Sequence, residues 1–268
     1  MRNMRIAAGI ILAAIVLFVL PAEWTAPRPY EEQFRDAVEV GPSRQFPLGT
    51  DSLGRDRWSR LIHGTRLSLT LSAAAAALCV ILAAIIGGAA GYFGGPIERG
   101  ILLFIDLFLS LPWLFLLLAI RAALPLNVSP EVSMAVTFAL LGCLGWAGPA
   151  RVACTAVREF RTGDPMLQSR AMGMSPARVV LRQLLPALSP LLRSQFWIAI
   201  PLFILSEANL GALGLSVSEP LPSWGNLLAE LQFLPRIADQ PAILVPAVLL
   251  CLTVCCIQLL TRREVKNI

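Results

Sequence analysis

Side chains that could carry out chemistry are few in this sequence of 268 residues, and they do not form a reactive cluster. His63 is the only histidine, so neither a Ser-His-Asp nor a Cys-His arrangement can be built around it with any support. The six cysteines lie in or beside apolar runs, show no metal-type C-x-x-C pairing and lack the histidines that would complete a zinc site. We interpret the cysteines as small packing residues and His63 as a solvated interfacial residue.

Nucleotide chemistry is also not expected of this chain. The sequence has no G-x-x-x-x-G-K-S/T phosphate loop and no Gly-rich turn between a strand and a helix. We therefore predict that the chain neither binds nor hydrolyses ATP, that it is not an enzyme, and that it has no catalytic, metal-binding or cofactor-binding residues. Any energy-driven process must then take its energy from a partner.

Two carboxylates, Asp106 and Glu207, lie within long apolar stretches. An ionised carboxylate in hydrocarbon is costly, so each should face protein, water or a partner subunit. For Glu207 two interpretations remain open: it lines a pathway for a solute, or it makes a structural hydrogen bond to a neighbouring helix. Asp106 lies close in sequence to Glu98 and Arg99, which favours a local ion pair.

The elements that must position these residues are membrane-spanning helices. Of all residues 56% are hydrophobic and 15% are charged, whereas a soluble domain carries about 25% charged residues. The apolar residues form runs long enough to cross a hydrocarbon core, which takes about 20 residues of helix. We predict an all-α, polytopic membrane protein with about six transmembrane helices, at residues 6–20, 67–91, 101–120, 132–150, 195–217 and 242–260.

These runs divide the chain into four parts. Residues 1–25 form an N-terminal transmembrane helix, residues 26–66 an extracytoplasmic or interfacial segment, residues 67–260 the main transmembrane domain, and residues 261–268 a cytoplasmic tail. Arg2 and Arg5 before a short apolar run would also suit a cleavable signal peptide. However, no convincing small-residue cleavage site follows Leu20, and Trp24 suits an interfacial anchor.

The distribution of basic residues predicts that both termini are cytoplasmic. Seven arginines lie between the fourth and fifth predicted helices, and three basic residues follow the last helix. The arginines that argue mildly against this orientation lie just before the second helix: Arg55, Arg57, Arg60 and Arg66. The net charge of +5 does not indicate a nucleic-acid partner, because the basic residues lie on loops that flank the membrane.

The cytoplasmic connection at residues 151–194 changes abruptly in composition from apolar to basic. Asp164 and Pro165 predict a helix start, with Asp164 as the N-cap and Pro165 at the first helical position. Gly173 is expected to end this short helix, and Ser175 with Pro176 to begin another. Two short helices bent at a glycine suit a docking element; an amphipathic loop at the lipid headgroups is the alternative.

This connection resembles the EAA loop of ABC importer permeases, in which a glycine is followed after about a dozen residues by Leu-Pro, as Gly173 is followed here by Leu185 and Pro186. Other segments resemble the dipeptide/oligopeptide/nickel permease subfamily, in particular its second permease subunit. They are residues 46–56 (FPLGTDSLGRD), 59–62 (SRLI), 64–69 (GTRLSL), 90–95 (AGYFGG), 213–215 (LGL) and 222–228 (PSWGNLL). The resemblance extends in the same order from residue 46 to about residue 260.

The resemblance implies the type I ABC importer permease fold and a location in the cell membrane of a prokaryote. It implies half of a translocation pathway, paired with a second permease subunit within the membrane lipid. Two ABC ATPase subunits and an extracytoplasmic solute-binding protein would be its other partners, and transport would proceed by alternating access. Di- or oligopeptides are the expected solutes. The alternatives are a nickel or other small-solute importer, an ion-coupled secondary transporter, for which we detect no repeat, and a membrane enzyme, for which we find no catalytic cluster.

The resemblance also implies a set of residues that couple this subunit to an ATPase: Met166, Leu167, Arg170, Met172, Gly173, Met174 and Pro186. The sequence departs from the family here, because Leu167-Gln168-Ser169 stands where the family has Glu-Ala-Ala. An acidic contact to the ATPase therefore cannot be carried over. Met166, Leu167 and Met172 are expected to seat in a groove instead, with Arg170 at its rim.

Glycines and prolines within the predicted helices suggest close packing and bending. Gly87, Gly88 and Gly91 would let another helix approach closely, and Pro112 and Pro201 would bend the third and fifth helices. Both residue types are also common in membrane helices that have no hinge.

Overall fold

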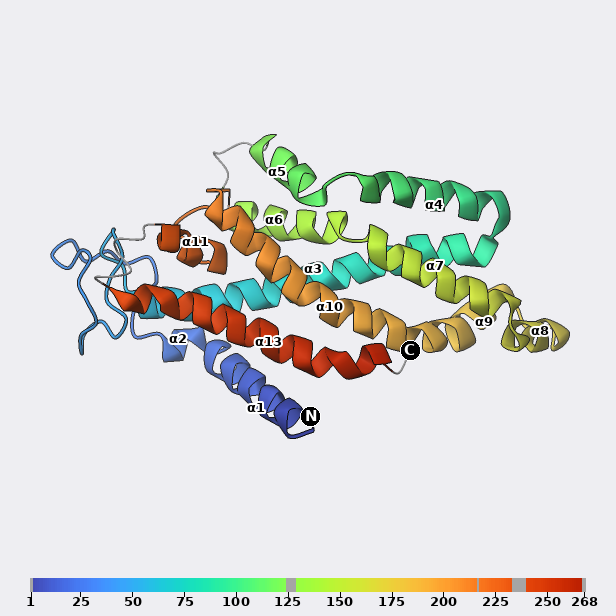
Figure 1. Ribbon diagram of the computed structural model, residues 1–268, viewed down its shortest axis with the longest axis horizontal. Coiled ribbons are helices and arrows are strands. Elements are labelled where there is room, and N and C mark those ends of the chain that lie inside the picture. The colour runs from blue at the N-terminus through green and yellow to red at the C-terminus, as the bar shows by residue number, and fades with distance from the viewer. Residues whose placement is uncertain (1, 124–128, 216, 233–239, 267–268) are drawn as a thin grey trace. The chain divides into compact units, whose positions relative to one another are not determined.

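The computed structural model describes residues 2–123, 129–215, 217–232 and 240–266, which are mostly helical (Figure 1). The first helices are α1 (Arg2–Val19), α2 (Ala22–Thr25), α3 (Arg57–Phe93), α4 (Gly95–Ser110), α5 (Trp113–Ala123) and α6 (Pro130–Leu144). They are followed by α7 (Ala147–Thr162), α8 (Asp164–Ala171), α9 (Pro176–Val179), the π-helical turn η1 (Val180–Leu184), α10 (Leu185–Ala212), α11 (Trp224–Ala229), the 3₁₀ turns η2 (Glu230–Gln232) and η3 (Pro241–Leu244), and α13 (Val245–Lys266). No β-strand occurs among these residues, which confirms the all-α prediction.

Helices long and apolar enough to cross a membrane account for most of the predicted spans. Four stretches qualify within the described residues: Arg57–Phe93, Pro130–Thr162, Pro176–Ala212 and Pro241–Thr261. A fifth span results if α4 and α5 are counted as one interrupted helix. The first predicted span falls on α1, whose apolar part, Asn3–Val19, is shorter than the others. Length and composition thus support four or five spans, with α1 as a further apolar helix, where six were predicted.

The two prolines that were expected to bend spans differ in effect. Helix α4 ends at Ser110 and α5 begins at Trp113, so the helix is interrupted at Pro112. Proline has no N–H and its ring clashes with the preceding turn, which explains the interruption. By contrast, α10 continues through Pro201 as one helix.

The chain forms two compact units. The first unit comprises Met1–Ser72, Leu118–Phe138 and Pro201–Leu260, and the second comprises Ala73–Leu117, Ala139–Ile200 and Thr261–Ile268. Five helices contribute residues to both units: α3, α5, α6, α10 and α13. Within the first unit, Arg5 of α1 donates hydrogen bonds to the carbonyl groups of Leu259 and Leu260 in α13, at 3.2 and 2.8 Å.

The core of the second unit joins α3, α4 and α7. Its buried residues are Ala83, Ile105, Trp146, Ala147 and Ala150. A Cβ added to Gly87 would lie 2.1 Å from the carbonyl oxygen of Ala150, and one added to Gly91 would lie 2.5 Å from that of Cys154. The predicted close approach is therefore confirmed at Gly87 and Gly91, whereas Gly88 has no atom within 4 Å of its Cβ position.

Ion pairs also connect α4 to α7 in this unit. Arg158 Nη1 lies 3.3 Å from Glu98 Oε1, and Asp106 pairs with Arg151. The ion pair expected for Asp106 is present, but its partner is Arg151 on α7 rather than the sequence neighbour Arg99. Sequence proximity was misleading because Asp106 faces the neighbouring helix.

Candidate coupling site

Helix α8 is the short helix that was predicted in the basic connection, and it follows α7 directly (Figure 1). The N–H groups of Met166 and Leu167 bond to the carbonyl of Gly163, at 3.2 and 3.5 Å. Gly163 is therefore the N-cap, and Asp164 is the first helical residue rather than the cap itself. The carboxylate in the first turn is favourable because a helix N-terminus carries partial positive charge.

Gly173 follows the end of α8 in a left-handed conformation, with φ of 65°. The Met174 N–H bonds to the Ser169 carbonyl over 3.0 Å, which is the outer bond of a Schellman turn. A side chain with a Cβ is strained at this backbone angle, whereas glycine is not. The predicted helix end at Gly173 is thus confirmed.

The apolar side chains of the predicted coupling set do not share one face of α8. Met166 is 5% exposed, whereas Leu167 is 59% and Met172 is 67% exposed. Met166 therefore supports α8 from within the chain, and the expectation that it enters a partner's groove needs correction. Leu167 and Met172 are available to a partner. The side chain of Arg170 lies outside the described part of the structure.

Polar contacts attach α8 to the turn that follows it. Ser169 is fully buried, and its hydroxyl donates to Gln183 Oε1 over 2.5 Å. The amide nitrogen of Gln183 lies 3.5 Å from the sulfur of Met174. Ser169 stands where the family has the second alanine of Glu-Ala-Ala, so the departure from the family pattern supplies a bond that alanine cannot make.

The segment after Gly173 also begins as predicted, with α9 starting at Pro176 directly after Ser175. It continues through η1 into α10, where the Leu185 N–H bonds to the Val180 carbonyl, one residue further back than in an α-helix. The next residue, Pro186, has no N–H to give to the preceding turn. A π-type turn is a common way to absorb such a local irregularity. Pro186 therefore shapes the path of the backbone.

A small hydrophobic cluster supports this segment within the second unit. Val157 of α7 packs with Leu184, Leu188 and Leu191, and the partly buried Tyr92 of α3 covers them. The cluster connects α7, which precedes α8, with α10, which follows it. Force applied to α8 would therefore reach both helices.

Glu207 lies in the first unit near the end of α10 and is fully buried. Its Oε1 accepts a hydrogen bond from the Ser223 hydroxyl over 2.6 Å, and its Oε2 accepts one from the Gly225 N–H over 3.0 Å. This geometry corresponds to the structural hydrogen bond that was one of the two interpretations. A pathway-lining role for Glu207 stays a prediction.

A buried cluster of charges in the first unit connects the segment before α3 with the loop before α11. Asp51 accepts hydrogen bonds from the backbone N–H groups of Leu53 and Arg55, at 2.9 and 2.8 Å. Arg55 and Arg60 lie 2.6 and 3.0 Å from the carboxylate of Glu219. Burial opposes the charged form of Arg55, but the hydrogen bond to Glu219 and the charge of Asp51 together raise the pKa of Arg55. The positive charges of these arginines are thus paired with carboxylates of the same chain.

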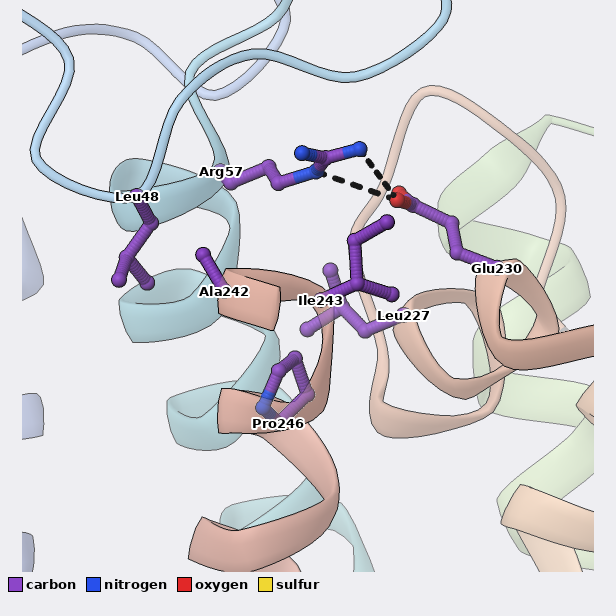
Figure 2. A pocket seen from close by; sticks show the side chains of 7 residues that line it. All are labelled: Leu48, Arg57, Leu227, Glu230, Ala242, Ile243 and Pro246. Atoms are coloured by element: carbon purple, nitrogen blue, oxygen red, sulfur yellow. Dashed lines mark hydrogen bonds and ion pairs between the residues drawn. The ribbon is translucent and has the colours of Figure 1, made fainter. Parts of the chain in front are cut away.

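Figure 2 shows a small pocket in the first unit, with the guanidinium of Arg57 directed at the carboxylate of Glu230. The two groups are 3.1 Å apart. Burial raises the pKa of Glu230, and the charge of Arg57 opposes that shift. The rest of the lining is apolar: Leu48, Leu227, Ala242, Ile243 and Pro246. Its volume of about 10 Å³ has room for one water molecule and not for a solute.

Comparison with known proteins decides what kind of chain carries these features. Residues 80–264 match the family described as the binding-protein-dependent transport system inner membrane component. The chain belongs to this family. It is a membrane-embedded permease subunit of a binding-protein-dependent ABC importer, as the sequence motifs predicted.

Individual permeases of the family are similar over most of the chain. The oligopeptide transport system permease protein OppC of Haemophilus influenzae is 28% identical over 254 residues, which cover 94% of this chain and 79% of OppC. The di/tripeptide transport system permease protein DppC of Pseudomonas aeruginosa is 34% identical over 232 residues, or 83% and 74% of the two chains. The nickel transport system permease protein NikC of Escherichia coli is 32% identical over 225 residues, or 83% and 78%. The predicted resemblance to this subfamily is confirmed.

The permease fold is also similar to one that has been solved. A chain of the MetNI methionine ABC transporter, determined in inward-facing conformations, matches with a TM-score of 0.57 and 21% identity. The match covers 77% of this chain and 95% of that chain. It confirms the type I importer permease fold.

The acidic partners of the permease's buried arginines were not predicted from the sequence. Glu219 and Glu230 lie in the connection between α10 and α13, about 160 to 170 residues after Arg55 and Arg57. A signal for them does exist in the sequence. Several arginines next to an apolar helix need counter-ions when they are buried, and few acidic residues lie in that connection.

Proposed function

We propose that this permease imports peptides and that α8 docks it to an ATPase subunit on the cytoplasmic side. The observation that carries the docking role is the exposure of Leu167 on α8 (59%) and of Met172 directly after α8 (67%), where Ser169 bonds α8 to Gln183 of η1. A fixed helix with apolar side chains directed outward suits insertion into a groove of a partner.

The proposed assembly contains a second permease subunit, two ABC ATPase subunits and an extracytoplasmic solute-binding protein. ATP-driven closure of the ATPases would displace α8, and alternating access would follow from the movement of the spans. The subunit itself would transmit motion and would not catalyse. Native mass spectrometry of a membrane extract tests this composition. A homo-oligomer of this chain that transports without ATPase subunits would overturn it.

The docking role is tested by charge substitution on α8 in the assembled complex. Leu167→Asp and Met172→Asp should each weaken ATPase retention about tenfold or more, because burying such a side chain stabilises by about 1.5–3 kcal/mol. Leu167→Met keeps the apolar area and is the matched control. Arg170, which the sequence predicts at the rim of the groove, should contribute less, so Arg170→Ala should change binding by about 0–1 kcal/mol. Wild-type retention and binding-protein-stimulated hydrolysis in both Asp variants would show that the docking element lies elsewhere in residues 151–194.

Peptides are proposed as solutes because the similar permeases OppC and DppC are named for oligopeptide and di/tripeptide transport. The likeness to NikC, named for nickel transport, makes a nickel chelate the second candidate. Titration of the purified cognate binding protein by calorimetry, with di- and oligopeptides and with nickel chelates, separates the two. Binding of the nickel chelate alone would replace the peptide proposal.

We further propose that both termini are cytoplasmic, as the arginine distribution predicts. The ion pairs of Arg55, Arg57 and Arg60 support this orientation. These arginines are buried beside carboxylates, so they are not available to hold the segment before α3 in the cytoplasm.

A further inference from the structure

Helix α11 is packed against two long helices of the first unit by direct backbone contacts. Its first residue, Trp224, is fully buried, and the Trp224 N–H donates to the Ser68 hydroxyl of α3 over 3.1 Å. On the other side, a Cβ added to Gly211 of α10 would lie 2.1 Å from the Gly225 carbonyl oxygen. Helix α11 therefore lies against the backbone of α10, and Figure 1 shows it beside the end of that helix.

Glu207 supplies the polar part of this contact. One carboxylate oxygen accepts from the hydroxyl of Ser223, and the other accepts from the Gly225 N–H. Ser223 is the N-cap of α11, because its hydroxyl oxygen also accepts from the Asn226 N–H over 3.2 Å. One carboxylate on α10 thus holds both the cap and the first turn of α11.

The contact between Glu207 and α11 lies on the helix that follows the coupling residues in the chain. The coupling segment comprises α8, α9 and η1, at residues 164–184. Helix α10 begins directly after it at Leu185 and continues without interruption to Ala212. Glu207 follows Leu185 by 22 residues within this helix. In the proposed coupling, a displacement at α8 would be transmitted through α10 to the residues that hold α11.

We propose that Glu207 is a positioning residue that fastens α11 to α10, so that α11 moves with α10 during the transport cycle. This inference rests on the proposed coupling function of α8. It differs from a pathway-lining role, in which the carboxylate would face the solute and not two donors of its own chain. The loop that contains α11 is predicted to be extracytoplasmic, so the fastening would convert movement at the coupling segment into movement at the opposite face.

The test uses the assembled complex with a reporter cysteine at Ala229→Cys, at the end of α11, in a background without the native cysteines. Maleimide labelling is compared in nucleotide-free and ATP-trapped states. We expect the labelling rate to depend on nucleotide in the wild type. Ser223→Ala and Glu207→Ala should remove that dependence and reduce binding-protein-stimulated ATPase activity at least threefold, with basal ATPase activity unchanged. Glu207→Gln should be intermediate, because an amide offers one acceptor oxygen where the carboxylate offers two.

Two further variants make the outcome decisive. Ser223→Thr keeps the hydroxyl and should retain nucleotide-dependent labelling. Ser206 is a buried serine of α10 whose hydroxyl donates to the Leu202 carbonyl, so Ser206→Ala should behave as the wild type. If Ser223→Ala retains both nucleotide-dependent labelling and stimulated hydrolysis while Glu207→Ala loses transport, Glu207 acts on the solute and the proposal fails. Failure of the coupling function itself would appear separately, as a complex in which Leu167→Asp still retains its ATPases.

Discussion

The hydroxyl of Ser169 donates to Gln183 Oε1 over 2.5 Å, and this bond joins α8 to the π-helical turn η1. It connects residues that are 14 positions apart on either side of Gly173. The bond therefore holds α8 against the turn that leads into α10.

Ser169→Ala should loosen α8 without unfolding the spans. The lost bond contributes about 0.5–1.5 kcal/mol, and Gln183 is left with a weaker contact to Met174. Hydrogen exchange of residues 166–172 should become several-fold faster. Gln168→Ala, at an exposed position of the same helix, is the control and should leave exchange unchanged. Equal exchange in Ser169→Ala and the wild type would mean that packing alone holds α8.

Gly173 should tolerate asparagine far better than valine. Its φ of 65° is accessible to asparagine with little strain, whereas a β-branched side chain is strongly disfavoured there. No atom lies within 4 Å of the Cβ position, so the difference should come from the backbone and not from a clash. We expect Gly173→Val to impair ATPase docking and Gly173→Asn to retain most of it, measured by co-purification. Similar loss in both variants would indicate that a partner packs directly onto this glycine.

Neighbouring glycines of α3 offer a matched pair for testing the contact with α7. Gly87→Ala places a methyl group 2.1 Å from the Ala150 carbonyl oxygen, so the helices must separate, at a cost of about 1–3 kcal/mol. Gly88→Ala meets nothing and should be neutral or slightly stabilising, since alanine favours the helix. Thermal unfolding of the purified subunit in detergent measures both. The prediction is wrong if the two midpoints fall together.

Glu230 should make the stability of the first unit depend on pH. Burial raises the pKa of this carboxyl above its ordinary value of 4.5 despite the charge of Arg57. The folded state then holds the proton more tightly than the unfolded chain. Its contribution to stability is present below the ordinary pKa and is lost as the pH rises through the raised pKa. Wild-type melting midpoints should fall across this range, and Glu230→Gln should lack that fall. Parallel curves for the two proteins would contradict the assignment.

The predicted membrane orientation can be tested by labelling cysteines introduced at two exposed serines. Ser52 and Ser175 are solvent-exposed, unlike the buried Asp51 and Trp224, and serine to cysteine is a small change. In intact cells a membrane-impermeant maleimide should label Ser52→Cys, whereas Ser175→Cys should react only after permeabilisation. Labelling of both cysteines from the same side would remove one span between them.

The parts of the fold that were predictable depend on local pattern. Long apolar runs located the spans, and Gly173 and Pro176 located the ends of the short helices, because these signals lie within a few residues of the structure they specify. The sequence did not predict that the side chain of Met166 is buried while that of Leu167 is exposed. Adjacent residues point about 100° apart on a helix, and eight residues are too few to define an apolar stripe.

Ion pairs between residues far apart in the sequence could not be predicted from local pattern. Asp106 pairs with Arg151 on another helix, and Arg55 with Glu219 at 164 positions away. Nothing in the local sequence selects these partners from the other charged residues. The structure was needed to show both that Arg55 is buried and that Glu219 is its partner.

During synthesis, Glu207 leaves the ribosome before the residues that bond to its carboxylate in the folded chain. Ser223 and Gly225 follow it by 16 and 18 residues. An ionised carboxylate without donors is costly in hydrocarbon, so the donors of α11 lower the cost of placing Glu207 within α10. The stable placement of α10 therefore depends on a segment that follows it in the chain. A chain truncated between Ala212 and Ser223 would lack both donors.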